Sequence, residues 1–300
     1  MQDDEVTYRI RHTTTYAYSG VVTLAHNEAR LSPRNGPFQV AHHARLVVDP
    51  APAFVAREHD YFGNAVNLFV LQEPHRRFSV TAHSEVSLRA PFLPDPDETM
   101  PWEEVRDRLA NSTEQEVFEA LEHVFESPYV RWNSAIFEYA ARSFTPGRPL
   151  LAAALDLSRR IHTEFEYRPG VTSVATPVAS VFEQRSGVCQ DFAHLFIACM
   201  RSHGLAARYV SGYLLTRPAA GQPRLIGADA SHAWTAVYCP DYDFIDLDPT
   251  NDLLVTIEHP TLAWGRDFGD VSPLKGVVLG GGAHHVEVSV EVMPIDDDPP

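Results

Sequence analysis

The chain has 300 residues, of which 44% are hydrophobic and 21% charged, a composition typical of a soluble globular protein. This length allows one large domain or two ordinary ones, each with a sizeable core. The 40 acidic and 24 basic side chains give a net charge of −16. Such a charge repels phosphate backbones and anionic lipids, so we expect neither nucleic acid nor a membrane surface as a partner.

The N-terminus and the cysteines indicate a compartment. Residues 1–5 are acidic where a signal peptide would be basic, and no apolar segment follows them. The chain has only three cysteines, Cys189, Cys199 and Cys239. A small, odd number of cysteines does not fit a disulfide framework. Since none of them forms a C-x-x-C pair, a structural zinc site is also disfavoured. We expect a cytoplasmic protein with no cofactor and no metal.

The N-terminal region has the pattern of a β-rich domain. Polar and bulky residues alternate at 6–12 and again at 78–88, where Phe78, Val80, Ala82, Val86 and Leu88 share one face. Turn signals such as those at 19–20, 33–37 and 63–64 separate the strands. We therefore expect an all-β, sandwich-like domain over residues 1–92.

A proline-rich linker at 90–97 is followed by a change of pattern. The pattern predicts broken helix at 102–144, helices at 150–165 and 190–202, and strands at 208–215, 231–239, 242–247 and 286–292. The fold class is thus α+β. We expect a second domain at 102–293, with its core at 150–255, and an acidic tail at 294–300.

Cys189 stands where a turn enters the helix at 190–202. At a helix N-terminus, free backbone N–H groups and the helix dipole favour a thiolate over a thiol. The same N–H groups can stabilise the oxyanion of a tetrahedral intermediate. Gly187 would allow a substrate to come close to the sulfur.

His232 and Asp248 complete a candidate constellation. His232 begins one strand and Asp248 ends the next, so the two would meet if these strands form an antiparallel hairpin. The acid would then orient the imidazole, which would serve the cysteine as a base. Each residue alone has a plainer explanation, as a buried cysteine, a structural histidine and a turn residue. In this order and within about sixty residues, they are much more specific for catalysis.

Some neighbouring residues leave alternatives open. Asp246 has the same strand parity as Asp248 and could compete for His232. Asp191 could support the site, or could simply be an acid favoured by the helix dipole. His194 is poorly spaced for contact with Cys189 along a helix.

Several runs resemble the bacterial transglutaminase-like cysteine enzymes of the papain-like superfamily. In the C-terminal part these runs are 185–194 (RSGVCQDFAH), 208–213 (RYVSGY), 230–234 (ASHAW), 248–251 (DPTN) and 265–271 (GRDFGDV). The N-terminal runs 12–16 (HTTTY), 31–34 (LSPR), 60–64 (DYFGN) and 74–75 (PH) resemble the β-rich domain that precedes the catalytic core in that family. The resemblance covers nearly the whole chain.

The resemblance implies a papain-like α+β core with Cys189 as nucleophile, His232 as base and acid, and Asp248 as orienting group. Residues 242–244 depart from the Gly-Trp that relatives often carry before the aspartate, which changes a wall of the cleft but not the triad. Candidate oxyanion or substrate-binding residues are Gln190, Gln184, Tyr167 and Trp234.

The expected function is hydrolysis of peptide or protein amide bonds through a thioester acyl-enzyme. One alternative is an acyltransferase that passes the acyl group to an amine acceptor. Another is a non-catalytic binding module on the same fold, although an intact Cys, His and Asp argues against it. A metal enzyme built on Cys189, His194, His203 or His232 is disfavoured because the chain has no His-Glu-x-x-His motif.

Overall fold

The computed structural model describes residues 5–215 and 230–295. The N-terminal region forms one seven-stranded antiparallel sheet together with the last two strands of the chain. Its members are β1 (Glu5–Ala29), β2 (Gln39–Asp49), β3 (Phe54–His59), β4 (Ala65–Leu71), β5 (His75–Arg89), β13 (Leu274–Gly280) and β14 (His284–Pro294). The expected acidic tail lies mostly outside the described residues.

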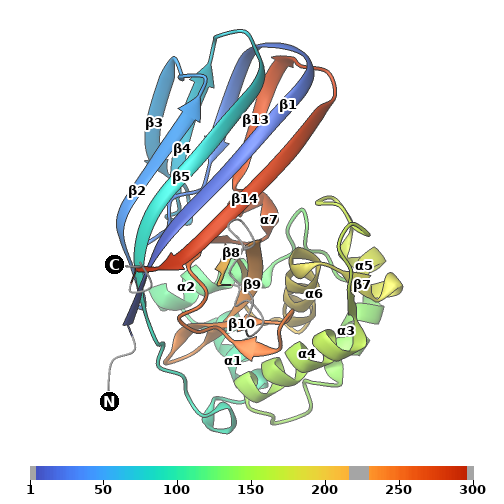
Figure 1. The fold of residues 1–300 in the computed structure, drawn as a ribbon. Helices are drawn as coiled ribbons and strands as arrows, with labels where there is room; N and C mark the ends of the chain where they lie inside the picture. The colour runs from blue at the N-terminus through green and yellow to red at the C-terminus, as the bar shows by residue number, and fades with distance from the viewer. Residues whose placement is uncertain (1–4, 216–229, 296–300) are drawn as a thin grey trace, which may run out of the picture.

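β1 organises this sheet because it bends and pairs along both halves. Its first half pairs with β5 and β14, and its second half with β4 and β13. Gly280, Gly281 and Gly282 all have positive φ and turn the chain from β13 into β14 beside the bend of β1. Figure 1 shows β1 and its red partner rising together, curving over and descending.

The expected inward face of β5 is correct. Phe78, Val80, Ala82, Val86 and Leu88 are all buried, whereas His83 between them is exposed. They pack into a core with Tyr8, Ile10 and Phe69 from the neighbouring strands of the bent sheet.

The C-terminal part packs helices against a second antiparallel sheet. Its helical elements are η1 (Pro96–Glu98), α1 (Trp102–Asn111), α2 (Gln115–Leu121), η2 (Glu122–Val124), α3 (Ser134–Ala141), α4 (Leu150–Glu164), α5 (Val178–Gln184), α6 (Cys189–Ser202) and α7 (Phe268–Val271). The sheet has the order β11 (Leu253–Leu254), β10 (Asp243–Asp248), β9 (Ala230–Cys239), β8 (Ala207–Leu214) and β12 (Thr261–Gly265). A short parallel pair, β6 (Glu166–Tyr167) and β7 (Ser186–Gly187), precedes α6.

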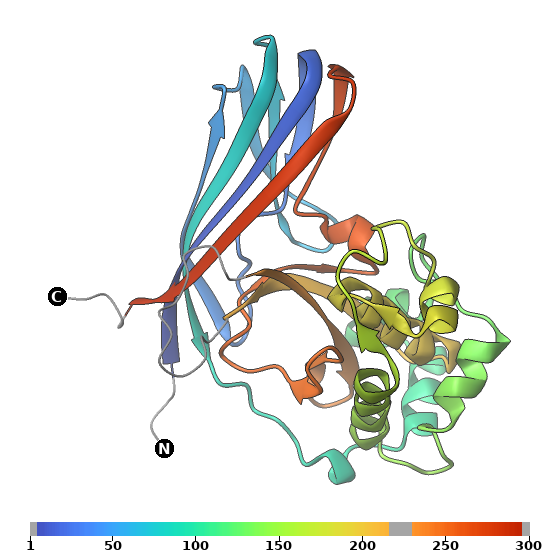
Figure 2. The same ribbon diagram turned by 45° about the vertical axis from the view of Figure 1, so that its right-hand side comes forward.

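The central helix α6 is buried along almost its whole length and packs on β8 and β9. Figures 1 and 2 show α3, α4 and α6 together on one side of this sheet. No helix within the described ranges has both the length and the apolar character needed to cross a membrane.

The division of the chain differs from the expected one at its C-terminal end. Residues 274–293 were expected to belong to the second domain, but β13 and β14 pair with β1. Figure 2 shows these red strands rising beside β1, away from the helices. The alternating valines of β14 supply the buried Val290 and Val292 to the core, which explains the pairing. The N-terminal sheet is therefore built from both ends of the chain.

Candidate active site

The helix α6 begins at Cys189, and an acid fixes this start. The Asp191 carboxylate accepts hydrogen bonds from the backbone N–H of Val188, at 2.8 Å, and from the Thr172 hydroxyl, at 2.6 Å. Burial raises the pKa of Asp191, although both hydrogen bonds favour the charged form. Asp191 is thus a helix-capping residue that holds the turn in front of the sulfur.

The structure gives a reason for glycine at position 187. A Cβ atom at this position would lie 2.8 Å from the Cβ and Oδ2 of Asp191. The missing side chain therefore makes room for the capping carboxylate. The hydrogen bond from Val188 to Asp191, just before Cys189, depends on this space.

His232 and Asp248 meet across the hairpin of β9 and β10. The two strands are antiparallel, and Nε2 of His232 lies 2.7 Å from Oδ2 of Asp248. The side chain of His232 is 8% exposed and that of Asp248 is 0% exposed, so the pair is shielded from water. Because Nε2 faces the carboxylate, Nδ1 is the ring nitrogen left for a proton donor or acceptor on the other side.

The Asp248 carboxylate is held as an anion by several donors. Oδ1 accepts the backbone N–H groups of Thr250, at 2.9 Å, and Asn251, at 3.3 Å. Oδ2 accepts the Asn251 side-chain amide at 2.6 Å in addition to His232. Burial alone would raise the pKa of Asp248, but side-chain hydrogen bonds from His232, His259 and Asn251, together with the charge of His232, hold it well below its usual range.

His232 also interacts with Cys189. Burial alone would lower the pKa of His232, but hydrogen bonds with Asp248 and with Cys189, together with their charges, raise it to about 10. The imidazole is therefore charged at neutral pH, beside the sulfur at the positive end of α6. His232 thus lies between the Cys189 side chain and the Asp248 carboxylate and interacts with both.

Three of the four further candidates lie near Cys189, either in space or in the sequence. Tyr167 is 52% exposed on β6, and the negative charge of Cys189 adds to the burial that raises its pKa. Gln190 adjoins Cys189 in α6 and donates its side-chain amide to the carbonyl of Val174 at 3.2 Å. Gln184 ends α5 and is exposed.

The fourth candidate, Trp234, is not placed to bind a substrate. Its side chain is fully buried, and its indole N–H donates to Asp246 at 3.2 Å. The ring lies 6.1 Å from that of His232 and packs beside it. The expectation of a cleft-lining Trp234 is therefore wrong, because strand parity placed its ring in the core.

The open alternatives among the neighbouring residues also resolve. Asp246 bonds to Trp234, and Asp248 is the acid that faces His232. His194 accepts the backbone N–H of Phe268 at 3.1 Å, and burial lowers its pKa to about 3, so it is a neutral structural residue. His203 stacks on Phe137 with 4.5 Å between ring centroids, away from the triad.

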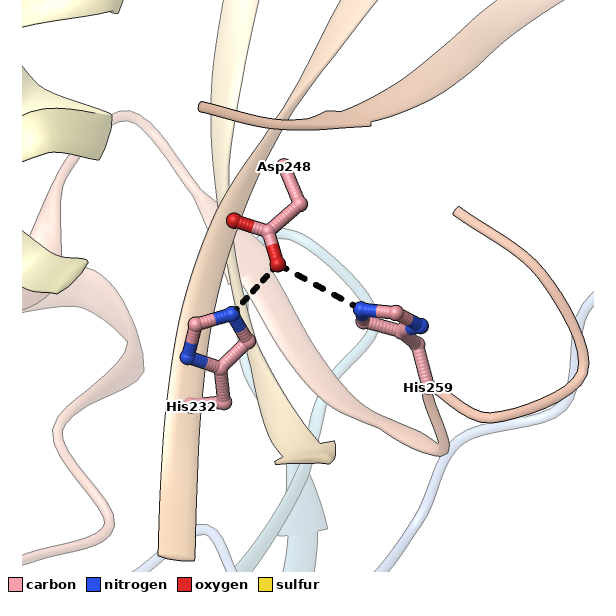
Figure 3. A group of neighbouring side chains, drawn as sticks. All are labelled: His232, Asp248 and His259. Atoms are coloured by element: carbon pink, nitrogen blue, oxygen red, sulfur yellow. Dashed lines mark hydrogen bonds and ion pairs between the residues drawn. The ribbon is translucent and has the colours of Figure 1, made fainter. Parts of the chain in front are cut away.

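Two residues near the site had no role in the sequence analysis. Asn251 lies in the Asp-Pro-Thr-Asn turn, and its position three residues after Asp248 could have suggested its contact with the carboxylate. His259 follows β11, and its Nε2 lies 3.4 Å from Oδ2 of Asp248. No spacing in the sequence points to His259, because it reaches the site from a loop. Figure 3 shows the rings of His232 and His259 directed at the same carboxylate oxygen.

The same three side chains have the composition of a metal site. Ligand atoms of His232, Asp248 and His259 all lie within 4.8 Å of one another. However, the 2.7 Å between His232 and Asp248 is a hydrogen-bond distance, whereas two ligands of a tetrahedral zinc ion would lie about 3.3 Å apart. Asn251 also directs an N–H group at the shared oxygen. The geometry fits a hydrogen-bond network better than a metal cage.

A helix whose first residue faces a His–Asp pair on an antiparallel sheet, beside a β-rich domain, defines an α+β protein with a transglutaminase-like core. Residues 8–87 match the bacterial transglutaminase-like N-terminal region, and residues 138–249 match the transglutaminase-like superfamily. The chain belongs to this superfamily and carries its bacterial N-terminal region.

Relatives with similar sequences occur in mycobacteria and in Pseudomonas. An uncharacterized protein of Mycobacterium tuberculosis is 42% identical over 302 residues, which cover 97% of this chain and 94% of the relative. One of Mycobacterium leprae is 33% identical over 95% of this chain and 97% of its own length. A protein-glutamine gamma-glutamyltransferase of Pseudomonas aeruginosa is 34% identical over 104 residues, 33% of this chain and 15% of that protein.

The fold also resembles a solved structure. A crystal structure from Cytophaga hutchinsonii, described as a candidate cysteine protease, superposes with a TM-score of 0.78. The match covers 100% of this chain and 94% of that one, at 20% sequence identity. At this identity the likeness establishes the shared fold.

Proposed function

We propose that this protein is a cysteine peptidase or amidase that cleaves amide bonds through Cys189, His232 and Asp248. The observation that carries the proposal is the position of His232, whose Nε2 lies 2.7 Å from Oδ2 of Asp248 and whose ring also interacts with Cys189. A buried structural histidine would have its pKa lowered, as His194 does, whereas that of His232 is raised.

In the proposed acylation step, the Cys189 thiolate attacks the carbonyl carbon of an amide. The backbone N–H of Cys189, in the first turn of α6, stabilises the oxyanion. Tyr167 and Gln190 are the side chains we propose as further donors. As the intermediate collapses, the C–N bond breaks and the proton on His232 passes to the leaving amine. The acyl group stays on the sulfur as a thioester.

In the proposed deacylation step, neutral His232 takes a proton from water while the oxygen attacks the thioester. The C–S bond breaks, the acid leaves, and the proton on His232 restores the ion pair with Cys189. Throughout both steps Asp248 keeps the imidazole oriented and stabilises its charged form.

Transfer to an amine is the second candidate. The partial match to a protein-glutamine gamma-glutamyltransferase favours it. In that case a primary amine would replace water in the second step, and the thioester would be the same. The two reactions differ only in the acceptor that reaches the acyl-enzyme.

Mass spectrometry of reaction mixtures tests the proposal and separates the two reactions. The protein is incubated with a peptide pool, with and without primary amines, and the masses of the protein and of the peptides are measured after an acid quench. We expect an acyl adduct on Cys189 that is absent from Cys189→Ala. Peptide carboxylic acids would establish hydrolysis, and amine-bearing peptides would establish transfer. An adduct or product that persists in Cys189→Ala would refute the proposed nucleophile.

A further inference from the structure

His259 has no part in the steps above, yet it contacts the acid of the triad. Its side chain is 1% exposed, and Nε2 lies 3.4 Å from the same oxygen of Asp248 that His232 contacts. Nδ1 of His259 is buried and makes no hydrogen bond within the described residues. With a proton on Nε2, the ring donates to this carboxylate.

The His259 ring is fixed by its neighbours. It packs edge to face on Trp234, with ring centroids 5.3 Å apart at 82°. Trp234 is itself held by the hydrogen bond that its indole N–H donates to Asp246. These contacts leave His259 little freedom to turn away from Asp248.

The backbone on either side of His259 is attached to β8. The carbonyl of Glu258 accepts the N–H of Leu215 at 3.1 Å, and that of Pro260 accepts the N–H of Tyr213 at 2.9 Å. This close approach requires a glycine on β8, because a Cβ atom at Gly212 would overlap the Pro260 carbonyl and the Trp234 ring. The loop therefore has one well-defined path past the triad.

The N-terminal domain makes hydrogen bonds to Thr261, which follows Pro260 in this loop. The side-chain amide of Gln39, on β2, donates to the Thr261 carbonyl at 2.8 Å and accepts the Thr261 N–H at 2.7 Å. Asn64 makes the same paired contact with Trp264, at 2.8 and 2.9 Å. Two side chains of the N-terminal domain thus take the place of a neighbouring strand on β12, and the Gln39 contact lies two residues from His259.

We propose that His259 is a positioning residue for the triad, and that the N-terminal domain keeps it in place through Gln39. The proposal rests on the function proposed above. With donors from Asn251 and His259 beside that of His232, the shared oxygen of Asp248 has one preferred orientation. This gives the β-rich domain a direct effect on the chemistry, beyond its contribution to folding.

The test uses the full-length protein and the rate at which iodoacetamide alkylates Cys189, which needs no substrate. We expect His259→Leu to slow alkylation near neutral pH by about tenfold, since the His232–Asp248 pair loses a positioning donor. His259→Gln keeps an N–H donor at similar reach and should restore the rate to within about twofold.

Gln39→Ala provides a second variant at a distance from the triad, and Asn64→Ala is its matched control. We expect Gln39→Ala to slow alkylation by about threefold and Asn64→Ala to leave it unchanged, although Gln39→Ala removes three side-chain hydrogen bonds, Asn64→Ala removes four, and both lower the melting temperature. In the double variant Gln39→Ala/His259→Leu, the rate should equal that of His259→Leu alone, because both changes act through one contact.

Any of three results with the His259 variants would overturn the proposal: an unchanged rate in a folded His259→Leu, a His259→Gln as slow as His259→Leu, or multiplying effects in the double variant. Equal slowing by Gln39→Ala and Asn64→Ala would reduce the effect to general destabilisation and would overturn it too. Failure of the proposed function would look different, because Cys189→Ala would then turn over its substrate normally.

Discussion

Nε2 of His232 lies 2.7 Å from Oδ2 of Asp248, a carboxylate with no exposed surface, and His232 also interacts with the side chain of Cys189. The raised pKa of His232 and the depressed pKa of Asp248 both result from this arrangement. Because these groups are coupled, a change at Asp248 should be measurable at Cys189.

Cys189 should be the reactive cysteine. It is partly exposed and paired with a charged imidazole, whereas Cys199 and Cys239 are buried. Burial raises the pKa of the Cys239 thiol to about 12, and it raises that of Cys199 further still. Iodoacetamide at about pH 6 should label Cys189 at least about tenfold faster than the other two. Peptide mapping measures this, and equal labelling of all three in the folded protein would contradict it.

The pH dependence of turnover should report His232. The active form needs a protonated imidazole, and the pKa of His232 is raised to about 10 by Asp248 and Cys189 despite its burial. Asp248→Asn removes one negative charge, so the alkaline limb of kcat/KM should move to lower pH, toward about 6.5. Rate profiles for both proteins measure the shift. A limb that stays in place would assign it to another group.

Stability should show the same linkage. A histidine with a raised pKa in the folded protein stabilises it fully below its unfolded value of about 6.5 and loses this effect as the pH rises through the folded value. For His232 that folded pKa is about 10. The melting-temperature gap between wild type and Asp248→Asn should therefore be largest at about pH 5 to 6 and shrink toward pH 10. A gap that widens with pH would reverse the assigned sign.

Gly187→Ala should damage the site through the helix cap. Its Cβ would lie 2.8 Å from Asp191, so the carboxylate must shift away from the N–H of Val188. We expect a loss of about 1–3 kcal/mol in the free energy of unfolding, with slower alkylation of Cys189. Urea unfolding measures the first effect. Gly36→Ala is a control, since a Cβ there meets nothing within 4 Å and, as at Gly187, the backbone φ is not positive. Full stability in Gly187→Ala would show that the cap can move freely.

Much of the fold follows from patterns in the sequence. The 3.6-residue period predicts α4 and α6, and the strand pattern predicts β5, β8 and β9. Each of these elements buries at least one face against its neighbours. The return of β13 and β14 to β1 could not be predicted in this way. Periodicity shows that a strand has a buried face but does not show which strand it pairs with.

The site shows the same limit. Cys189, His232 and Asp248 stand out because their chemistry coincides with element ends, where side chains can converge. Trp234 lies beside His232 on the same face of β9, as alternation predicts, but its ring is buried and so is closed to a substrate. The contact of His259 could not be predicted, because a loop brings this residue to Asp248. Contacts made by loops depend on tertiary packing, which no local pattern encodes.

The most direct measurement of the central claim compares kcat/KM among wild type, Cys189→Ala, His232→Ala, Asp248→Asn and the double variant Cys189→Ala/His232→Ala. Each single change should lower kcat/KM by about 10³-fold or more with little change in melting temperature. Because the residues act as one unit, the double variant should be scarcely worse than either of its parents. Normal turnover in the folded single variants, or losses explained wholly by unfolding, would contradict a catalytic triad and leave Cys189 as a packing residue.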